Sequence, residues 1–199
     1  CIKKQLYGKA YLIRFADDFL IMFQYERDAQ RVYEAVIKRM ELFGLELSKE
    51  KTRILPFGRN SVSRETFDFL GFTHFNSKTR KGYYSVGHKI SRKKKKQFKS
   101  NLRKWVKENR NTQFDEFMKA LNKKLTGSFN YYSLSGMIRE IKCLWYHSLF
   151  VTFKWLNRRS QRRSFKMERF CEIWNARIIR PYIHVDIWSG DKVIYNKNV

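Results

Sequence analysis

The chain has 199 residues, of which 43 are lysine or arginine and 18 are aspartate or glutamate, so its net charge is +25. This excess favours a polyanionic partner, and the 17% of aromatic residues favours nucleic acid over an anionic membrane, because bases stack on rings. No stretch reaches the roughly 18 apolar residues of a membrane span, and the N-terminus lacks the zones of a signal peptide. We therefore expect an intracellular protein with no membrane partner.

The charge is unevenly distributed along the chain. Residues 1–87 carry 16 basic and 10 acidic side chains, whereas residues 88–199 carry 27 and 8, which places most of the excess in the second half. The three cysteines are odd in number and far apart, so neither a disulfide framework nor a zinc site is predicted. We predict two domains, residues 1–88 and 89–199.

The first element is the stretch Tyr11-Leu-Ile-Arg-Phe-Ala-Asp-Asp-Phe-Leu-Ile-Met-Phe23. Two apolar runs flank Asp17 and Asp18, a pattern that predicts a hairpin with both acids at its tip. Carboxylates this close repel each other unless a cation neutralises them, and Mg²⁺ prefers carboxylate and phosphate oxygens. The chemistry indicated is metal-assisted phosphoryl transfer. A solvated Asp-Asp turn is the alternative, and composition alone favours it.

The rest of the first half alternates between one helix and short strands. Asp28 is expected to cap a helix that ends at Gly44. Residues 44–58 read as a strand, a turn with Lys51, and a second strand, and residues 67–75 and 83–86 read as another hairpin joined by a turn at 78–82. The predicted fold is α+β, with one helix packed on an antiparallel sheet.

The second half has helical periodicity. Ser91 is expected to cap a first helix, a second helix begins near Phe114, and a third runs from about Met137 to Leu156. A short helix at about 165–177 and a closing strand at 181–188 complete the prediction. The three long helices are expected to form a small bundle.

Two basic clusters lie in this half. The first opens a helix, where the macrodipole disfavours cations by roughly 0.3–1 kcal/mol per charge, so phosphate contact is one reading and a solvated basic run is the other. The second follows a helix end, where helix capping alone accounts for part of the charge. Arginine forks suit RNA phosphates. The residues assigned to RNA are Arg92, Lys93, Lys94, Lys95, Lys96, Arg158, Arg159, Arg162 and Arg163.

Three blocks occur in order: Leu12-Ile-Arg-Phe-Ala-Asp-Asp-Phe19, Gly44-Leu-Glu-Leu-Ser-Lys-Glu-Lys-Thr52 and Phe69-Leu-Gly-Phe72. Together they resemble the last reverse-transcriptase blocks of bacterial group II intron-encoded proteins. The resemblance extends to residues 121–132 and 154–160, which are similar to the thumb and maturase region of that family. Any one block is weak, and the ordered set is specific.

The resemblance implies a partial polymerase palm followed by a helical thumb and maturase domain. It assigns Asp17 and Asp18 to a pair of Mg²⁺ ions, with Ala16 next to the substrate backbone. Phe15 stands where the family usually has tyrosine, so a hydroxyl near the template and primer is replaced. Lys51 matches a lysine near nucleotide phosphates, although a solvated loop lysine fits equally well. The primer-gripping block corresponds to Phe69, Leu70, Gly71 and Phe72.

The family's third metal-binding carboxylate lies on an earlier strand, so the resemblance implies that this chain is the later part of a longer protein. We expect it not to extend a primer alone, and to need an N-terminal palm and fingers segment or a homodimer partner. The implied activity is RNA-directed DNA synthesis combined with intron RNA binding for splicing and retrohoming. The implied partners are group II intron RNA, an RNA template with a DNA primer, and dNTPs, in the bacterial cytoplasm as a nucleoid-associated ribonucleoprotein.

Other functions are compatible with the same residues. One is a non-catalytic RNA-binding maturase or splicing factor, and another is a different bacterial reverse transcriptase lineage, such as a retron. The plainest is a basic nucleic-acid-binding protein with a chance acidic turn. Discrimination between a structured group II intron RNA and random RNA separates these functions, because phosphate contacts alone do not discriminate.

Overall fold

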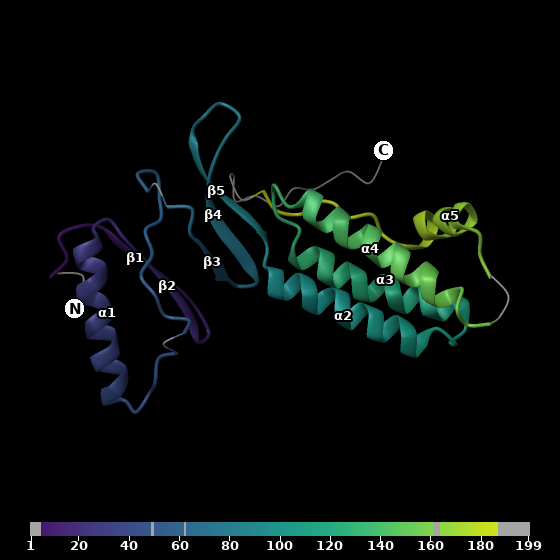
Figure 1. Ribbon diagram of the computed structural model, residues 1–199, viewed down its shortest axis with the longest axis horizontal. Helices are drawn as coiled ribbons and strands as arrows, with labels where there is room; N and C mark the ends of the chain where they lie inside the picture. Colours follow the sequence, from purple (N-terminus) through teal and green to yellow (C-terminus); the bar gives the residue numbers. More distant parts are fainter. Residues whose placement is uncertain (1–4, 49, 62, 161–163, 187–199) are drawn as a thin grey trace. The chain divides into compact units, whose positions relative to one another are not determined.

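The computed structural model describes residues 5–48, 50–61, 63–160 and 164–186, and these residues form an α+β fold (Figure 1). The strands are β1 (Ala10–Phe15), β2 (Asp18–Phe23), β3 (Thr66–Phe69), β4 (Phe72–Lys78) and β5 (Tyr84–Ile90). The helices are α1 (Glu26–Leu42), α2 (Arg92–Asn109), α3 (Phe114–Tyr131), α4 (Ile138–Leu156) and α5 (Met167–Arg177). The predicted fold class is confirmed.

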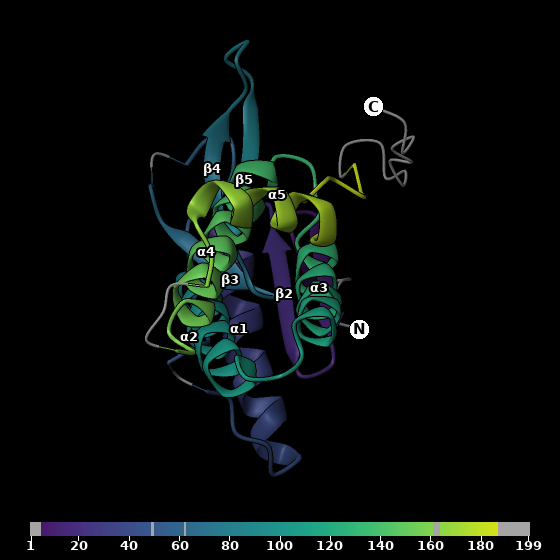
Figure 2. The same ribbon diagram turned by 90° about the vertical axis from the view of Figure 1, so that its right-hand side faces the viewer.

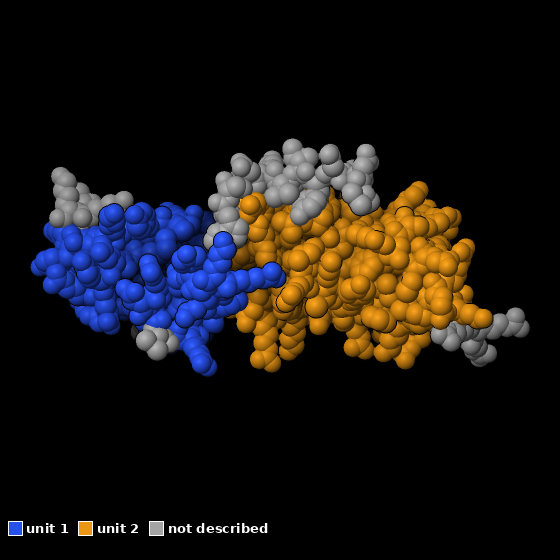
Figure 3. Space-filling model, turned by 90° about the horizontal axis from the view of Figure 1, so that it is seen from above, with its two compact units in different colours: residues 1–70, 74–87 blue, residues 71–73, 88–199 orange. Residues whose placement is uncertain are grey.

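The chain divides into two compact units. Unit 1 comprises residues 1–70 and 74–87, and unit 2 comprises residues 71–73 and 88–199 (Figure 3). Gly71–Thr73 therefore belong with the helices, although they lie well inside the first half of the sequence. The ring of Phe72 explains this assignment, because it stacks on Tyr131 with a centroid distance of 5.9 Å.

β1 and β2 form the predicted antiparallel hairpin, in which Ala10 pairs with Phe23 and Phe15 pairs with Asp18. Ala16 and Asp17 make the turn. α1 packs against β2. This pair of strands forms a two-stranded sheet of its own, separate from the sheet of β3, β4 and β5, so the prediction of one sheet covered by one helix is only partly right.

Asp28 does not cap α1, contrary to the prediction. Tyr25 takes the N-cap position, and Asp28 lies in the first turn with only 1% of its surface exposed. Its carboxylate accepts hydrogen bonds from the backbone N–H groups of Tyr7, at 3.3 Å, and Gly8, at 2.9 Å. Asp28 thus ties the segment before β1 to α1, and it satisfies donors about 20 residues away rather than the helix terminus.

Gly44 ends α1 as predicted, with a positive φ of 66°. Its N–H donates to the Glu41 carbonyl, and the N–H of Leu45 donates to the Met40 carbonyl. These two bonds make a Schellman motif, which leaves no ambiguity about where the helix stops.

The two strands predicted within residues 44–58 are wrong. The described residues of this segment contain a turn, in which the N–H groups of Lys51 and Thr52 both donate to the Ser48 carbonyl, at 3.0 and 2.9 Å. A strand needs backbone partners along its length, and no described strand pairs with this segment.

β3, β4 and β5 form a three-stranded sheet in that order. The hairpin of β4 and β5 confirms the predicted turn at residues 78–82, but residues 67–75 are not the single strand that was expected, because the chain turns at Leu70 and Gly71. Leu70 and Gly71 connect β3 to β4. The turn from β4 to β5 is closed by the Thr79 N–H, which donates to the Tyr83 carbonyl at 2.8 Å.

In unit 2, α2, α3 and α4 lie side by side, and α5 crosses α3 and α4 (Figures 1 and 2). Ser91 caps α2 as predicted, since its Oγ accepts a hydrogen bond from the Lys94 N–H at 3.4 Å. None of the helices in the described ranges has the length and apolar character needed to span a membrane. Their buried apolar side chains form the core of the unit: Leu102, Val106, Phe117, Met118, Leu121, Leu125, Phe129, Ile141, Leu144, Leu149, Phe170 and Trp174.

The closing strand predicted at residues 181–188 is not formed in its described part, which ends at Asp186. Val185 makes one parallel bridge to Leu134, and the His184 N–H donates to Ser133 Oγ at 2.7 Å. The segment is thus held mainly by the turn between α3 and α4. Ile187 and Trp188 lie outside the described residues.

Candidate functional site

The tip of the β1–β2 hairpin carries the two acids. The turn consists of Ala16 and Asp17, and Asp18 is the first residue of β2. Ala16 has a φ of +51°, a conformation that costs energy for a residue with a Cβ. Arg14 Nε donates to the Ala16 carbonyl at 3.0 Å, which holds the turn in this conformation. Both carboxylates are exposed at the tip.

The donor chemistry of this tip fits a hard cation. Two neighbouring carboxylates with no cation between them repel each other, and oxygen ligands of this kind suit Mg²⁺. Within the described ranges, no cluster of three or more His, Cys, Asp or Glu side chains could hold a metal ion. Asp17 and Asp18 therefore offer two carboxylate groups, and no third His, Cys, Asp or Glu side chain of the described residues joins them.

The second strained turn lies in the predicted primer-gripping block. Leu70 has a φ of +50° and Gly71 a φ of +81°, the pattern of a two-residue turn with left-handed residues at both positions. A Cβ on Gly71 would meet only side-chain atoms of Lys94 and Tyr132, at 3.5 and 3.6 Å, which is ordinary contact. Within this chain the glycine is therefore explained by its φ rather than by close approach of another backbone.

The described chain contains only two non-glycine residues with positive φ, Ala16 and Leu70. One lies beside the predicted metal ligands and the other lies in the predicted primer grip. Backbone strain of this kind costs of order 1–3 kcal/mol and tends to be kept at functional sites. Both strained positions therefore coincide with the motifs that the sequence singled out.

Gly71 and Phe72 are packed into unit 2. The Gly71 carbonyl accepts a hydrogen bond from the Ser91 N–H at 3.0 Å, and Phe72 contacts the rings of both Tyr131 and Tyr132. Burial raises the pKa of the Tyr132 phenol, and Tyr131 raises it further, so the Tyr132 hydroxyl stays protonated and can act as a donor. Phe69, by contrast, belongs to unit 1.

Residues 2–74 match the family described as reverse transcriptase (RNA-dependent DNA polymerase). The match supports a reverse transcriptase. It covers the acidic hairpin, α1 and the predicted primer-gripping block, and it ends within β4. No protein in the curated collection of characterised sequences matches the chain.

Lys51, the residue assigned to nucleotide phosphates in the reverse-transcriptase blocks, is exposed in the turn that follows Ser48. Its backbone N–H is used to close that turn. The Lys51 side chain therefore extends from a loop rather than from a turn between two strands.

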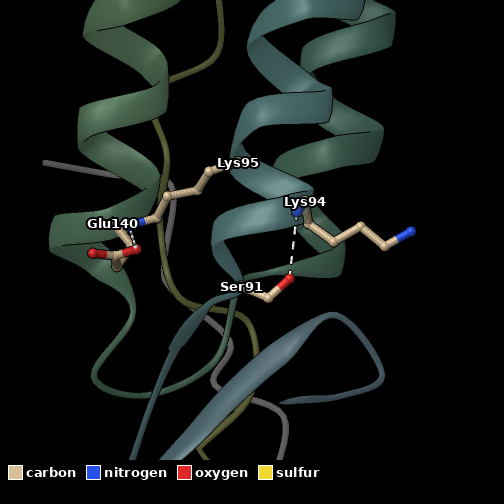
Figure 4. A network of polar contacts seen from close by, with 4 residues as sticks. All are labelled: Ser91, Lys94, Lys95 and Glu140. Carbon is tan, nitrogen blue, oxygen red and sulfur yellow. Dashed lines mark hydrogen bonds and ion pairs between the residues drawn. The ribbon is translucent and has the colours of Figure 1, made fainter. Parts of the chain in front are cut away.

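The first basic cluster opens α2. Arg92, Lys93, Lys94 and Lys96 are exposed, as an anion-binding role requires. Lys95 differs, because it is half-buried and forms an ion pair with Glu140 of α4 (Figure 4). The side chain of Lys94 points away from that pair (Figure 4). Four of the five residues are therefore available to a ligand, whereas Lys95 contributes to the packing of α2 on α4.

The second basic cluster follows α4 and is only partly free. Arg159 Nε donates to the Leu156 carbonyl at 3.3 Å, and its Nη1 donates to the Arg110 carbonyl at 3.5 Å. Arg159 thus satisfies carbonyl groups at the ends of both α4 and α2, which is a capping role. Arg158 is exposed. Arg162 and Arg163 lie outside the described residues.

The sequence did not single out Arg110 and Lys107. Arg110 Cζ, Arg158 Cζ and Lys107 Nζ lie 5.5, 5.7 and 5.9 Å from the centre of the Trp155 ring. Three cations thus surround one indole. The sequence does show that Arg110 directly follows the end of α2. It does not show that Arg110 lies near Trp155, because that proximity depends on how α2 packs on α4.

Proposed function

We propose that this chain is the later part of a group II intron reverse transcriptase and maturase. The hairpin of unit 1 would carry catalytic carboxylates for RNA-directed DNA synthesis, and the basic helices of unit 2 would bind the intron RNA. The ordered sequence blocks and the reverse-transcriptase match over residues 2–74 support this proposal.

One observation carries the catalytic part of the proposal: the two adjacent exposed acids sit on a turn with a strained alanine. A two-residue hairpin turn requires a positive φ in any case, but glycine or asparagine would adopt it at lower cost than alanine, so a plain solvated turn does not explain the alanine. The strain is understandable if the turn must present Asp17 and Asp18 in one orientation and keep bulk away from a bound substrate.

Each of these residues would have a distinct role. Asp17 and Asp18 would hold Mg²⁺, which when bound supplies the positive charge that phosphoryl transfer requires. Arg14 fixes the turn through the Ala16 carbonyl. Leu70 and Gly71 present the edge of the primer-gripping turn, and the ring of Phe72, held by Tyr131 and Tyr132, keeps that turn in place.

The proposed metal site can be tested without any polymerase activity. Mn²⁺ titration followed by electron paramagnetic resonance should show binding to the 199-residue chain. We expect Asp17→Asn and Asp18→Asn each to lower the affinity about tenfold or more, because each removes a charged ligand. Glu65→Gln, which removes an exposed carboxylate just before β3, is the matched control. Equal Mn²⁺ binding in all four proteins would contradict the site.

The maturase part has a separate test. Binding of a folded group II intron RNA should exceed binding of a random RNA of equal length, and the excess should persist when salt weakens both complexes. Equal affinities for the two RNAs would show that unit 2 binds polyanions in general and would contradict the maturase part of the proposal.

The positive charge of the helices of unit 2 favours a second function. A non-catalytic RNA-binding maturase would need the basic helices and no metal at all. Asp17→Asn and Asp18→Asn separate the two functions. If these variants lose Mn²⁺ binding and still bind the intron RNA, RNA binding does not depend on the metal site.

A further inference from the structure

An exposed row of four residues on α4 is not explained by the core, and only its last residue, Lys154, belongs to a block described above. Lys142, Tyr146, Phe150 and Lys154 follow one another at every fourth position, and all four are exposed. Residues spaced by four lie one above the other on a helix, about 6 Å apart along the axis. The row thus places two aromatic rings in sequence between two cations.

The two rings stand out within unit 2. Tyr146 is 55% exposed and Phe150 is 57% exposed, and in the described part of the unit the only other large exposed hydrophobic side chain is Tyr131. Eighteen apolar residues of the unit are buried, so the helices have the capacity to cover such groups. Two uncovered rings one turn apart therefore indicate a contact surface rather than incomplete packing.

The row has a rigid base. Tyr146 contacts the Trp145 ring edge-on, at a centroid distance of 5.0 Å. Trp145 in turn is buried, donates from Nε1 to the Ile179 carbonyl at 3.1 Å, and packs against Trp174 at 5.9 Å. A ring held in this way loses little conformational freedom when a flat ligand stacks on it.

The neighbouring helix makes the surface strongly positive. α2 lies beside α4 (Figure 2), and the two helices together carry 12 basic and two acidic side chains. One of the two acids, Glu140, is paired with Lys95. Further along the same two helices, burial and, to a lesser degree, the charge of Lys99 lower the pKa of His147, the residue after Tyr146. Lys107 lies over the Trp155 ring. Cations of α2 thus lie beside α4 along most of the length of the row.

We propose that the row Lys142, Tyr146, Phe150 and Lys154 binds unpaired nucleotides of an RNA, with bases stacked on the two rings and phosphates held by the lysines. Exposed ring faces suit unpaired bases, because the faces of paired bases are already stacked within a duplex. The positive surface argues for a polyanion over a protein partner or a second copy of this chain. The inference rests on the proposed function only in naming RNA as the polymer.

The test compares short labelled ligands by fluorescence anisotropy with the full chain: a single-stranded RNA dodecamer, the DNA dodecamer of the same sequence, and a blunt RNA duplex. We expect Tyr146→Ala and Phe150→Ala each to weaken binding of the RNA dodecamer about tenfold or more, since stacking supports each bound base. Duplex binding should change about twofold or less, because it depends on phosphate contacts. A loss confined to the DNA dodecamer, or an equal loss for the duplex, would overturn the proposal.

Two further comparisons keep the result interpretable. Phe150→Tyr should retain the affinity for the RNA dodecamer, and Tyr83→Ala, which removes an exposed ring from unit 1, should have no effect. Thermal melting by circular dichroism shows whether each variant is folded.

Lys142→Gln with Lys154→Gln should reduce the salt slope for the RNA dodecamer by about 1.4, whereas the ring variants should leave the slope unchanged.

Other occupants of the row give distinct results. If Tyr146→Ala and Phe150→Ala leave RNA binding intact and instead abolish self-association in sedimentation, the row is a contact between copies and the proposal is wrong. The metal-site variants at Asp17 and Asp18 should not alter binding of the RNA dodecamer, so failure of the catalytic proposal and failure of this one can be told apart.

Discussion

The two units differ sharply in how they bury apolar side chains. Among the described residues, unit 1 buries only two hydrophobic side chains, those of Ala29 and Val32, whereas unit 2 buries 18. Thirteen large hydrophobic side chains are exposed in unit 1, including Tyr11, Leu12 and Phe15 on β1, and three are exposed in unit 2. The sequence divides just as unevenly in charge, and the strongly basic half is the half with the core.

The difference shows that the two units are stabilised in different ways. A two-stranded sheet with one helix is marginal on its own, so the acidic hairpin depends on specific local ties such as those of Arg14 and Asp28. The helices of unit 2 have a conventional core and can hold many like charges on their surface. We expect the two units to respond independently to substitutions.

The largest expected effect is in the core of unit 2. Leu121 is fully buried on α3, so Leu121→Ala should lower the free energy of unfolding by about 2–5 kcal/mol. All four tryptophans among the described residues belong to unit 2, and the fifth also lies in the second half of the sequence, so urea unfolding followed by tryptophan fluorescence reports on that unit. Val32→Ala, the control in unit 1, should leave this midpoint unchanged. An equal shift for both variants would show that the units unfold as one.

A smaller effect is expected at Asp28 in unit 1. Asp28→Asn replaces a buried carboxylate that accepts two backbone hydrogen bonds, which should cost about 1–3 kcal/mol locally. Hydrogen exchange should then become faster at the Tyr7 and Gly8 amides, while the tryptophan fluorescence midpoint stays the same. Glu26→Gln, in the same helical turn but exposed, is the matched control. Unchanged exchange in Asp28→Asn would show that the carboxylate is not needed.

The smallest effect concerns pH and is confined to unit 2. Burial lowers the pKa of His147 and Lys99 lowers it further, so the folded chain resists protonation at this site. As pH falls below about 6.5, the unfolded chain takes up a proton that the folded chain does not, and stability decreases until the lowered folded pKa is reached. Above that window His147 has no effect.

His147→Gln should therefore reduce the loss of stability between about pH 7.5 and about pH 5.5, measured by urea midpoints at both values. Lys99→Gln should reduce the loss less, because burial is the larger cause. A loss of stability identical to that of the unsubstituted chain would show that other groups control the acid response.

Features of the fold could be predicted wherever their signal is local. The acidic hairpin, the Ser91 cap and the Gly44 helix end were all recognised correctly, because each depends on residues within a few positions of one another. The predicted strands in residues 44–58 failed for the opposite reason: the local pattern alternates, but a strand also requires a partner elsewhere. Asp28 was assigned to the wrong donors for the same reason, since its partners lie about 20 residues away.

The sequence by itself determined the order of the helices, the excess of positive charge in the second half, and the position of the two acids at the tip of a hairpin. Periodicity and capping are properties of neighbouring residues, so they can be read without coordinates. Only the tertiary structure decided which of many similar cations are free. Lys95 is engaged by Glu140 and Arg159 by two helix ends, while Lys142 and Lys154 flank exposed rings, because packing brings distant residues into contact.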